Sequence, residues 1–179
     1  MKNTKIFVRT KSKLYPIYFG DNIINTVGPL ISKNLPKVKK ICIIVDKNLP
    51  SNILKKINSS LKKYSTRIYK LSVSEKIKNF NLAHKLSENI IRDNFNRSDC
   101  VIALGGGILG DLSAFVASIT KRGIKFINIP TTLLAQVDAS IGGKTAVNSI
   151  HGKNLIGTFY QPDFVVTDIS LLNSLSQRE

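Results

Sequence analysis

The chain has 179 residues, enough for one domain with a sizeable core, and its 42% hydrophobic and 21% charged residues exclude a disordered chain. No apolar run reaches the roughly 18 residues that a membrane-spanning helix needs. The net charge of +16 fits binding of nucleic acid or of polyanionic small molecules, but solvated lysine faces are favoured because the densest basic stretches include one aromatic residue, Tyr64.

Strands and helices alternate along the chain after an N-terminal pair of strands. This alternation implies right-handed crossovers and a mostly parallel sheet with helices on both faces. We therefore expect one Rossmann-like α/β domain that begins with a β-hairpin. The predicted strands are 5–10, 15–19, 40–45, 67–71, 99–104, 125–129 and 164–167, and the predicted helices are 23–32, 53–64, 80–95, 109–119 and 133–139.

The cysteines and the N-terminal region indicate a cellular compartment. Cys42 and Cys100 each lie in an apolar run, so we expect buried free thiols, as is usual in a reducing cytoplasm. Lys11 and Lys13 precede any apolar stretch of signal-peptide length, so no secretory signal is predicted. We expect a cytoplasmic protein without a membrane partner.

A glycine-rich segment, Gly105-Gly-Gly-Ile-Leu-Gly-Asp111, follows the strand predicted at 99–104. Glycines at a strand-to-helix junction let the backbone approach an anion, which the free amides of the helix start then bind. A pyrophosphate fits this arrangement, although a tight turn without a ligand is the alternative. We place Asp111 in the first helical turn, where its carboxylate either caps the helix or contacts a ribose hydroxyl.

Polar residues also follow the strand predicted at 125–129. Thr131 and Thr132 can cap the next helix, and they leave the sheet at the same edge as the glycines, where open α/β sheets bind ligands. Further along, the segments 136–148 and 151–154 place lysines beside glycines. Such lysines are suited to phosphates or a polyhydroxy acid, and an ordinary surface loop is the alternative.

Together these motifs resemble 3-dehydroquinate synthase in order and in spacing. The resemblance is near-continuous from about residue 99 to residue 179 and thinner upstream, where Val45-Asp46 and Glu75…Lys78 match. One departure is Ser149-Ile150-His151, where the family often has His-Pro-Leu, so His151 is interpreted as a loop residue. The matching motifs are Gly105–Asp111, Arg122-Gly123, Pro130-Thr-Thr-Leu-Leu-Ala-Gln-Val-Asp138, Gly142-Gly-Lys144, Gly152-Lys-Asn154 and Phe159-Tyr-Gln-Pro162.

The resemblance implies an activity and its cofactors. The family binds NAD on an N-terminal α/β domain and a divalent metal ion, zinc or cobalt, on a helical C-terminal domain. It converts 3-deoxy-D-arabino-heptulosonate 7-phosphate, a sugar-acid phosphate, into 3-dehydroquinate and phosphate in the shikimate pathway, which leads to chorismate and the aromatic amino acids.

Carried over residue by residue, the resemblance assigns site residues to this chain. Asp138, Lys144 and Asn154 are implied to face the substrate, with Lys144 near both ligands. Arg122 resembles an arginine that reaches the phosphate pocket of a partner subunit, which implies a homodimer. The implied NAD contacts are Asp46, Glu75, Lys78, Gly107, Ile108, Leu109, Gly110, Asp111, Thr131, Thr132, Lys144 and Lys153, with Leu171, Leu172, Asn173 and Ser174 near the adenosine.

No metal site is predicted within residues 1–179. Catalytic zinc usually takes three protein ligands, whereas the two histidines, His84 and His151, show no paired spacing. The family's ligands, a glutamate and two histidines, follow the segment that matches Ser176–Glu179. We therefore expect residues 1–179 to be the NAD-binding domain, and the metal-binding domain to be absent from this sequence.

Several functional interpretations stay open. The chain is either the cofactor half of an active dehydroquinate synthase or a truncated fragment without activity, and we expect the chain alone to be inactive. Another sugar-phosphate cyclase of the same superfamily is a further alternative. Nucleic-acid binding, which predicts steeply salt-dependent association with DNA, is disfavoured.

Overall fold

A computed structural model of the chain describes residues 3–175, without the side chain of Ser174, so the segment 176–179 lies outside the described residues. Its main sheet has seven strands in the order β1-β2-β9-β6-β5-β3-β4, and every neighbouring pair except β1 and β2 is parallel. The predicted Rossmann-like fold and its N-terminal hairpin are thus confirmed. The strands of this sheet are β1 (Thr4–Arg9), β2 (Leu14–Gly20), β3 (Lys40–Asp46), β4 (Ser65–Leu71), β5 (Cys100–Gly105), β6 (Lys125–Pro130) and β9 (Phe164–Asp168).

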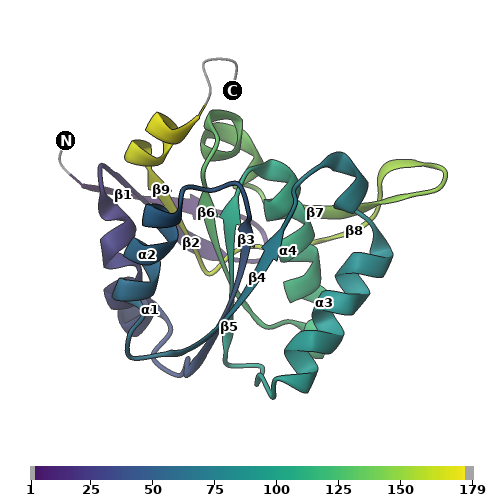
Figure 1. Cartoon of the computed structure of the whole chain (residues 1–179), viewed down its shortest axis with the longest axis horizontal. Coiled ribbons are helices and arrows are strands. Elements are labelled where there is room, and N and C mark those ends of the chain that lie inside the picture. The colour runs from purple at the N-terminus through teal and green to yellow at the C-terminus, as the bar shows by residue number, and fades with distance from the viewer. Residues whose placement is uncertain (1–2, 176–179) are drawn as a thin grey trace.

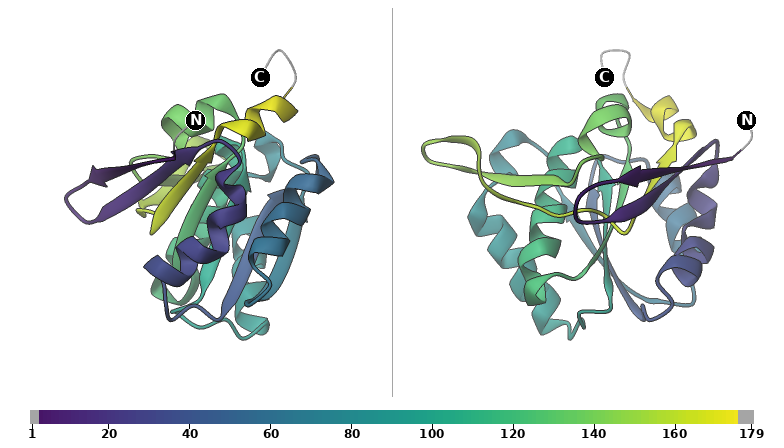
Figure 2. Two further views of the ribbon diagram at one scale, coloured as in Figure 1. Left: turned by 90° about the vertical axis from the view of Figure 1, so that its left-hand side faces the viewer. Right: turned by 180° about the vertical axis from the view of Figure 1, so that it is seen from behind.

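Helices cover both faces of the sheet, as Figures 1 and 2 show. The helices α1 and α2 pack on one face and α3 and α4 on the other, and each pair covers one of the two large apolar clusters of the described residues. The helices are α1 (Val27–Asn34), α2 (Ser51–Ser60), α3 (Phe80–Arg92) and α4 (Gly107–Ile119), and the short helical segments are η1 (Ile23–Thr26), η2 (Glu75–Ile77), η3 (Thr120–Arg122), η4 (Ala135–Ala139) and η5 (Ile169–Ser174).

The central strands are apolar on both sides because both of their faces are covered. In β3, Ile41, Ile43 and Val45 contribute to the core under α1 and α2. The alternate residues Cys42 and Ile44 contribute to the core under α3 and α4. A continuous apolar run at 41–45 therefore marks a buried parallel strand and cannot show which side chain faces which core.

The two cysteines are buried free thiols, as predicted. Burial raises the pKa of both thiols far above the ordinary value. We expect neither Cys42 nor Cys100 to react with a thiol reagent at mildly alkaline pH, because only the thiolate is nucleophilic. Titration with a chromogenic disulfide should find no reactive thiol in the folded protein and both after denaturation. Rapid reaction before unfolding would contradict this prediction.

The order in which successive strands are added to the sheet reverses between β3 and β5. From β3 the chain continues through α2 to β4 at one edge, whereas from β5 it continues through α4 to β6 on the other side. Because α2 and α4 lie on opposite faces, the segments that follow β3 and β5 leave the sheet toward opposite faces. Ligands of open α/β sheets bind at such a switch point.

Four local features differ from the prediction. The helix predicted from residue 109 begins at Gly107, and α3 ends at Arg92, before Asn94 takes a left-handed φ of 56°. The helix predicted at 133–139 continues from its first turn as a π-helix, η4. A hairpin of β7 (Lys144–Ser149) and β8 (Gly152–Phe159) forms a separate two-stranded sheet that was not predicted. In Figure 1 this hairpin projects beyond α3 and α4.

Among residues 3–175, no helix combines the length and the apolar character that crossing a bilayer requires.

Candidate functional site

The junction between β5 and α4 forms a narrow turn at the carboxyl edge of the sheet. Gly106 precedes the helix, and the first helical hydrogen bond runs from the Gly110 amide to the Gly106 carbonyl at 3.0 Å. The amides of the three residues between them precede the helical ladder, so they can bind an anion. A Cβ added to Gly106 would lie 3.1 Å from Thr132 Cγ2. Gly106 and Gly107 are nevertheless partly exposed, so the turn is open to a ligand.

Neighbouring strand ends contribute further polar groups to this edge. Asp46 ends β3, and its Oδ1 accepts a hydrogen bond from the amide two residues later at 2.9 Å. The Thr131 amide donates to the Gly105 carbonyl at 3.0 Å, which ties the two strand ends together. Thr132 Oγ1 accepts from the Ala135 amide at 3.4 Å, so the predicted hydroxyl cap is present.

Asp111 does not cap the helix, which was one of the two roles predicted for it. It is the fifth residue of α4 and lies outside the first turn, because the helix begins two residues earlier than predicted. Its Oδ2 accepts a hydrogen bond from the Lys78 ammonium at 2.5 Å. Lys78, which is only 5% exposed, also donates to Asn154 Oδ1 at 2.5 Å. Lys78 lies in the segment after β4. Its two hydrogen bonds therefore connect this segment to α4 and to the β7–β8 hairpin.

The carboxylates of this cluster differ in their electrostatic surroundings. Burial raises the pKa of Asp111 and outweighs the opposing effects of the hydrogen bond and charge of Lys78. The Asn148 carboxamide, which donates to Glu75 Oε1 at 2.7 Å, lowers the pKa of Glu75, and Lys153 and Lys78 lower it further. The two carboxyl groups thus have pKa values shifted in opposite directions.

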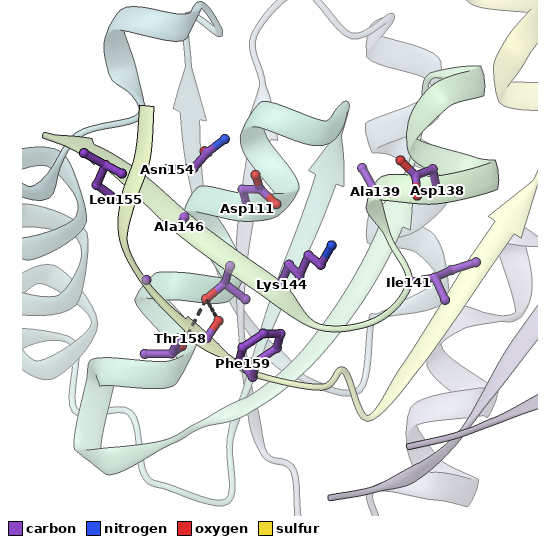
Figure 3. A pocket seen from close by; sticks show the side chains of 12 residues that line it. Asp111, Asp138, Ala139, Ile141, Lys144, Ala146, Asn154, Leu155, Thr158 and Phe159 are labelled. Carbon is purple, nitrogen blue, oxygen red and sulfur yellow. Dashed lines mark hydrogen bonds between the residues drawn. The ribbon is translucent and has the colours of Figure 1, made fainter. Parts of the chain in front are cut away.

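A cavity of about 520 Å³ adjoins the cluster. Asp111, Asp138, Lys144 and Asn154 contribute polar groups to its wall, and Phe159 is among the apolar side chains. Figure 3 shows the Lys144 ammonium extending between Asp111 and Asp138. The structure therefore brings the three residues predicted to face a substrate into one cavity, beside residues predicted to contact the cofactor.

Two other groups of predicted residues lie elsewhere. Arg122 is exposed just before β6, at the opposite edge of the sheet, and it lines a different hollow of about 680 Å³. Leu171 and Asn173 line a hollow of about 380 Å³ with Pro50 and Asn52, at the start of α2. Leu172 is half-buried in η5, and the side chain of Ser174 lies outside the described residues.

The chain was compared with known proteins. Residues 68–179 match the family described as 3-dehydroquinate synthase N-terminal. The chain belongs to this family. It is 48% identical over 175 residues to the 3-dehydroquinate synthase of Pelagibacter ubique (strain HTCC1062), covering 98% of this chain and 48% of that protein. It thus spans about half the length of the curated 3-dehydroquinate synthases that it matches.

Solved structures of related cyclases share the fold. A crystal structure of 2-deoxy-scyllo-inosose synthase has a TM-score of 0.90 and 28% identity, covering 98% of this chain and 49% of that one. Another, complexed with carbaglucose-6-phosphate, NAD⁺ and Co²⁺, has a TM-score of 0.87 and 29% identity, covering 94% of this chain and 47% of that one. The Rossmann-like fold expected for the N-terminal domain of a 3-dehydroquinate synthase is therefore present.

The remaining polar residues divide into those interpreted correctly and those missed. His84 is on the helix surface with its side chain 67% exposed. His151 is exposed in the hairpin turn, as predicted for a loop residue. Asn148 was not singled out, although its carboxamide contacts Glu75. The turn before β7 is also held by the Tyr15 hydroxyl, which accepts a hydrogen bond from the Gly142 amide at 3.2 Å. These two residues are 127 positions apart in the sequence. No local sequence signal points to such distant partners.

Proposed function

We propose that residues 1–179 form the NAD-binding domain of a 3-dehydroquinate synthase. The whole protein converts 3-deoxy-D-arabino-heptulosonate 7-phosphate into 3-dehydroquinate and phosphate. The observation that carries this proposal is the first part of α4, where the free helix-start amides are followed by Asp111, which pairs with Lys78 and lines the cavity. The 48% identity to a 3-dehydroquinate synthase supports the choice of reaction.

The residues at the start of α4 and at the neighbouring strand ends fit a dinucleotide. A diphosphate needs backbone amides that it can approach closely, and the turn at Gly106 and Gly107 offers them. We propose that Asp46, at the end of β3, contacts a ribose hydroxyl. Bound NAD supplies reversible hydride transfer with an alcohol of the substrate. The residues that we propose hold NAD are Asp46, Glu75, Lys78, Gly107–Asp111, Thr131, Thr132, Lys144, Lys153 and Leu171–Ser174.

The cavity is suited to a small, anionic, hydroxyl-rich substrate. Its volume of about 520 Å³ lies within the usual range of roughly 300–1,000 Å³ for small-molecule sites. We propose that the Lys144 ammonium binds an anionic group of the sugar-acid phosphate. Asp138 and Asn154 offer oxygen and amide groups that can orient its hydroxyls. Nucleic acid and membrane are not partners in this proposal.

The described residues do not supply a metal site. Residues 3–175 contain no group of three His, Cys, Asp or Glu side chains that could hold a metal ion. We propose that the ligands of a divalent ion such as Zn²⁺ or Co²⁺ lie in a further domain of the whole protein. Exposed apolar residues on η4 and just before it, Leu133, Leu134 and Val137, support an additional covering domain.

Arg122 fits a role between subunits of a homodimer. Lys121, Arg122 and Gly123 all have positive φ values, of 51°, 61° and 111°, which is unfavourable for the two longer residues. The chain thus holds an exposed guanidinium in a strained turn, and Arg122 does not line the cavity of its own subunit. We propose that Arg122 contacts an anionic group in the site of a second copy.

The protein encoded by the complete gene tests the proposed function. With NAD and a divalent metal ion, it should release phosphate from 3-deoxy-D-arabino-heptulosonate 7-phosphate, and residues 1–179 alone should release none. Binding of NAD without phosphate release by the complete protein would reject the reaction and retain the cofactor site. Phosphate release by residues 1–179 alone would reject the need for a second domain.

Lys153→Ala should weaken NAD binding by the complete protein about fivefold. The loss is moderate because Lys153 is exposed, and a solvent-exposed charge contributes about 1 kcal/mol at most. Calorimetry at two salt concentrations should show a smaller difference at the higher one. Lys33→Ala, which removes an exposed lysine on α1, is the matched control. Unchanged affinity in Lys153→Ala would remove this residue from the cofactor site.

A further inference from the structure

The β7–β8 hairpin is irregular where it reaches the Lys78 cluster. Val147 pairs with Ile156 and Ser149 pairs with Gly152, so one residue of β7 opposes three residues of β8 between these pairs. That single residue is Asn148. Bulges of this kind interrupt the ladder and redirect side chains. Here the bulge contains two of the proposed site residues, Lys153 and Asn154.

Asn148 forms three hydrogen bonds at the point where the β7–β8 ladder is interrupted. Its Oδ1 accepts from the Asn154 amide at 3.0 Å, and its Nδ2 donates to Glu75 Oε1 at 2.7 Å. Its own amide donates to the Lys78 carbonyl at 2.7 Å. Asn154 has a φ of 57°, a left-handed conformation that needs support from its surroundings. One side chain thus connects the bulge to the segment that carries Glu75 and Lys78.

We propose that Asn148 is a positioning residue of the cofactor site, holding Glu75 and the backbone of Asn154 so that the Lys78 ammonium meets Asp111 and Asn154 together. This inference rests on the proposed function, because the residues that it positions are proposed contacts of NAD and substrate. Asn148 lines neither the cavity nor the glycine turn among the described residues. It therefore acts through its neighbours.

The charged groups around Glu75 determine how a substitution of Asn148 affects the contact between these two side chains. Lys78 and Lys153 lower its pKa, and Asp111 is the nearby carboxylate that interacts with it. Asn148→Asp keeps an oxygen for the Asn154 amide but places a second carboxylate against Glu75. Two carboxylates that share a site raise the pKa of one of them, and the protonated group can then donate a hydrogen bond. Acidification should therefore restore the lost contact.

Calorimetry of NAD binding by the complete protein tests the inference. At about pH 8, Asn148→Asp should bind NAD about tenfold more weakly than the unaltered protein. At about pH 5.5 the difference should shrink to about threefold or less, because protonation recreates a donor. In a Glu75→Gln background, Asn148→Asp should cost less than about threefold at both pH values, since the glutamine amide can donate to the new carboxylate. Asn34→Asp, at a half-buried amide of α1 that donates to the Leu30 carbonyl at 2.7 Å, should change neither affinity nor pH profile.

The outcomes separate this inference from the proposed function. Failure of the unaltered protein to bind NAD overturns both. NAD binding by the unaltered protein, with Asn148→Asp equal to it at both pH values, overturns the inference alone. A lower melting temperature with unchanged affinity also overturns it, because Asn148 would then support only the fold. If Asn148→Asp does not fold, Asn148→Ser, whose hydroxyl is too short to reach Glu75, should show a tenfold loss that acidification does not reverse.

Discussion

Lys78→Met is expected to lower the free energy of unfolding by about 3 kcal/mol and to weaken NAD binding about 100-fold. The side chains of Lys78 and Asp111 are only 6% and 25% exposed, and removing one partner of a buried ion pair leaves the other charge unpaired. The substitution also removes the donor to Asn154 Oδ1. Urea unfolding and calorimetry of the complete protein measure the two effects. Lys76→Met, at an exposed lysine of η2, should change neither quantity.

A second substitution separates stability from binding at this pair. In Lys78→Met/Asp111→Leu no charge is left unpaired, and apolar replacement of a buried ion pair is often neutral for stability. The double variant should regain most of the lost unfolding free energy while NAD binding stays weak. Recovery of both quantities would show that the pair serves the fold alone. A single variant as stable as the unaltered protein would contradict the buried ion pair itself.

Gly107→Asp is expected to weaken NAD binding by about 100-fold or more without lowering the stability of the fold. Gly107 is the first helical residue of α4, where a carboxylate interacts favourably with the helix dipole, and aspartate is a better helix former than glycine. A Cβ there would lie 3.3 Å from Ala139 Cβ, a contact that a small shift relieves. The same carboxylate would repel a diphosphate, and like charges in contact cost several kcal/mol.

The size-matched comparison is Gly107→Ala, which adds the Cβ without the charge. Thermal unfolding without NAD should show both variants at least as stable as the unaltered protein. NAD binding should be reduced far more in Gly107→Asp than in Gly107→Ala. Equal affinities in the two variants would mean that the diphosphate is not bound at this turn.

The fold could be predicted from the sequence because its signals are local. The apolar run at 41–45 and the one-sided pattern of 80–92 each specify one element, and alternation of strands and helices specifies the parallel sheet. The β7–β8 hairpin could not be predicted in the same way. All eight residues of β8 are exposed, so burial imposes no alternation on its sequence. The turn at Ile150 and His151 also lacks the glycine or asparagine typical of tight hairpins.

The candidate site was predictable in its chemistry and less so in its contacts. The glycine turn predicts an anion-binding junction from its sequence alone, and the family resemblance pointed to Lys78 and Asn154, which the structure brings into contact. Nothing local shows that Lys78 and Asn154, 76 positions apart, form one hydrogen bond. The helix start predicted at residue 109 placed Asp111 in the first turn, where a carboxylate can cap the helix. The helix begins at Gly107, so Asp111 lies beyond its first turn. Asn148 was missed because its role depends on a bulge in the opposite strand.

The separate sheet formed by β7 and β8 has a consequence for how such a protein can diverge. Lys144, Asn154 and Phe159 reach the cavity from a two-stranded unit outside the seven-stranded sheet. Mutations in this unit can alter this wall of the cavity while the strands that carry the glycine junction keep their pairing. Under the proposed function, new substrate preferences can thus arise while the dinucleotide-binding strands stay unchanged, provided that the hairpin keeps its hydrogen bond to Lys78.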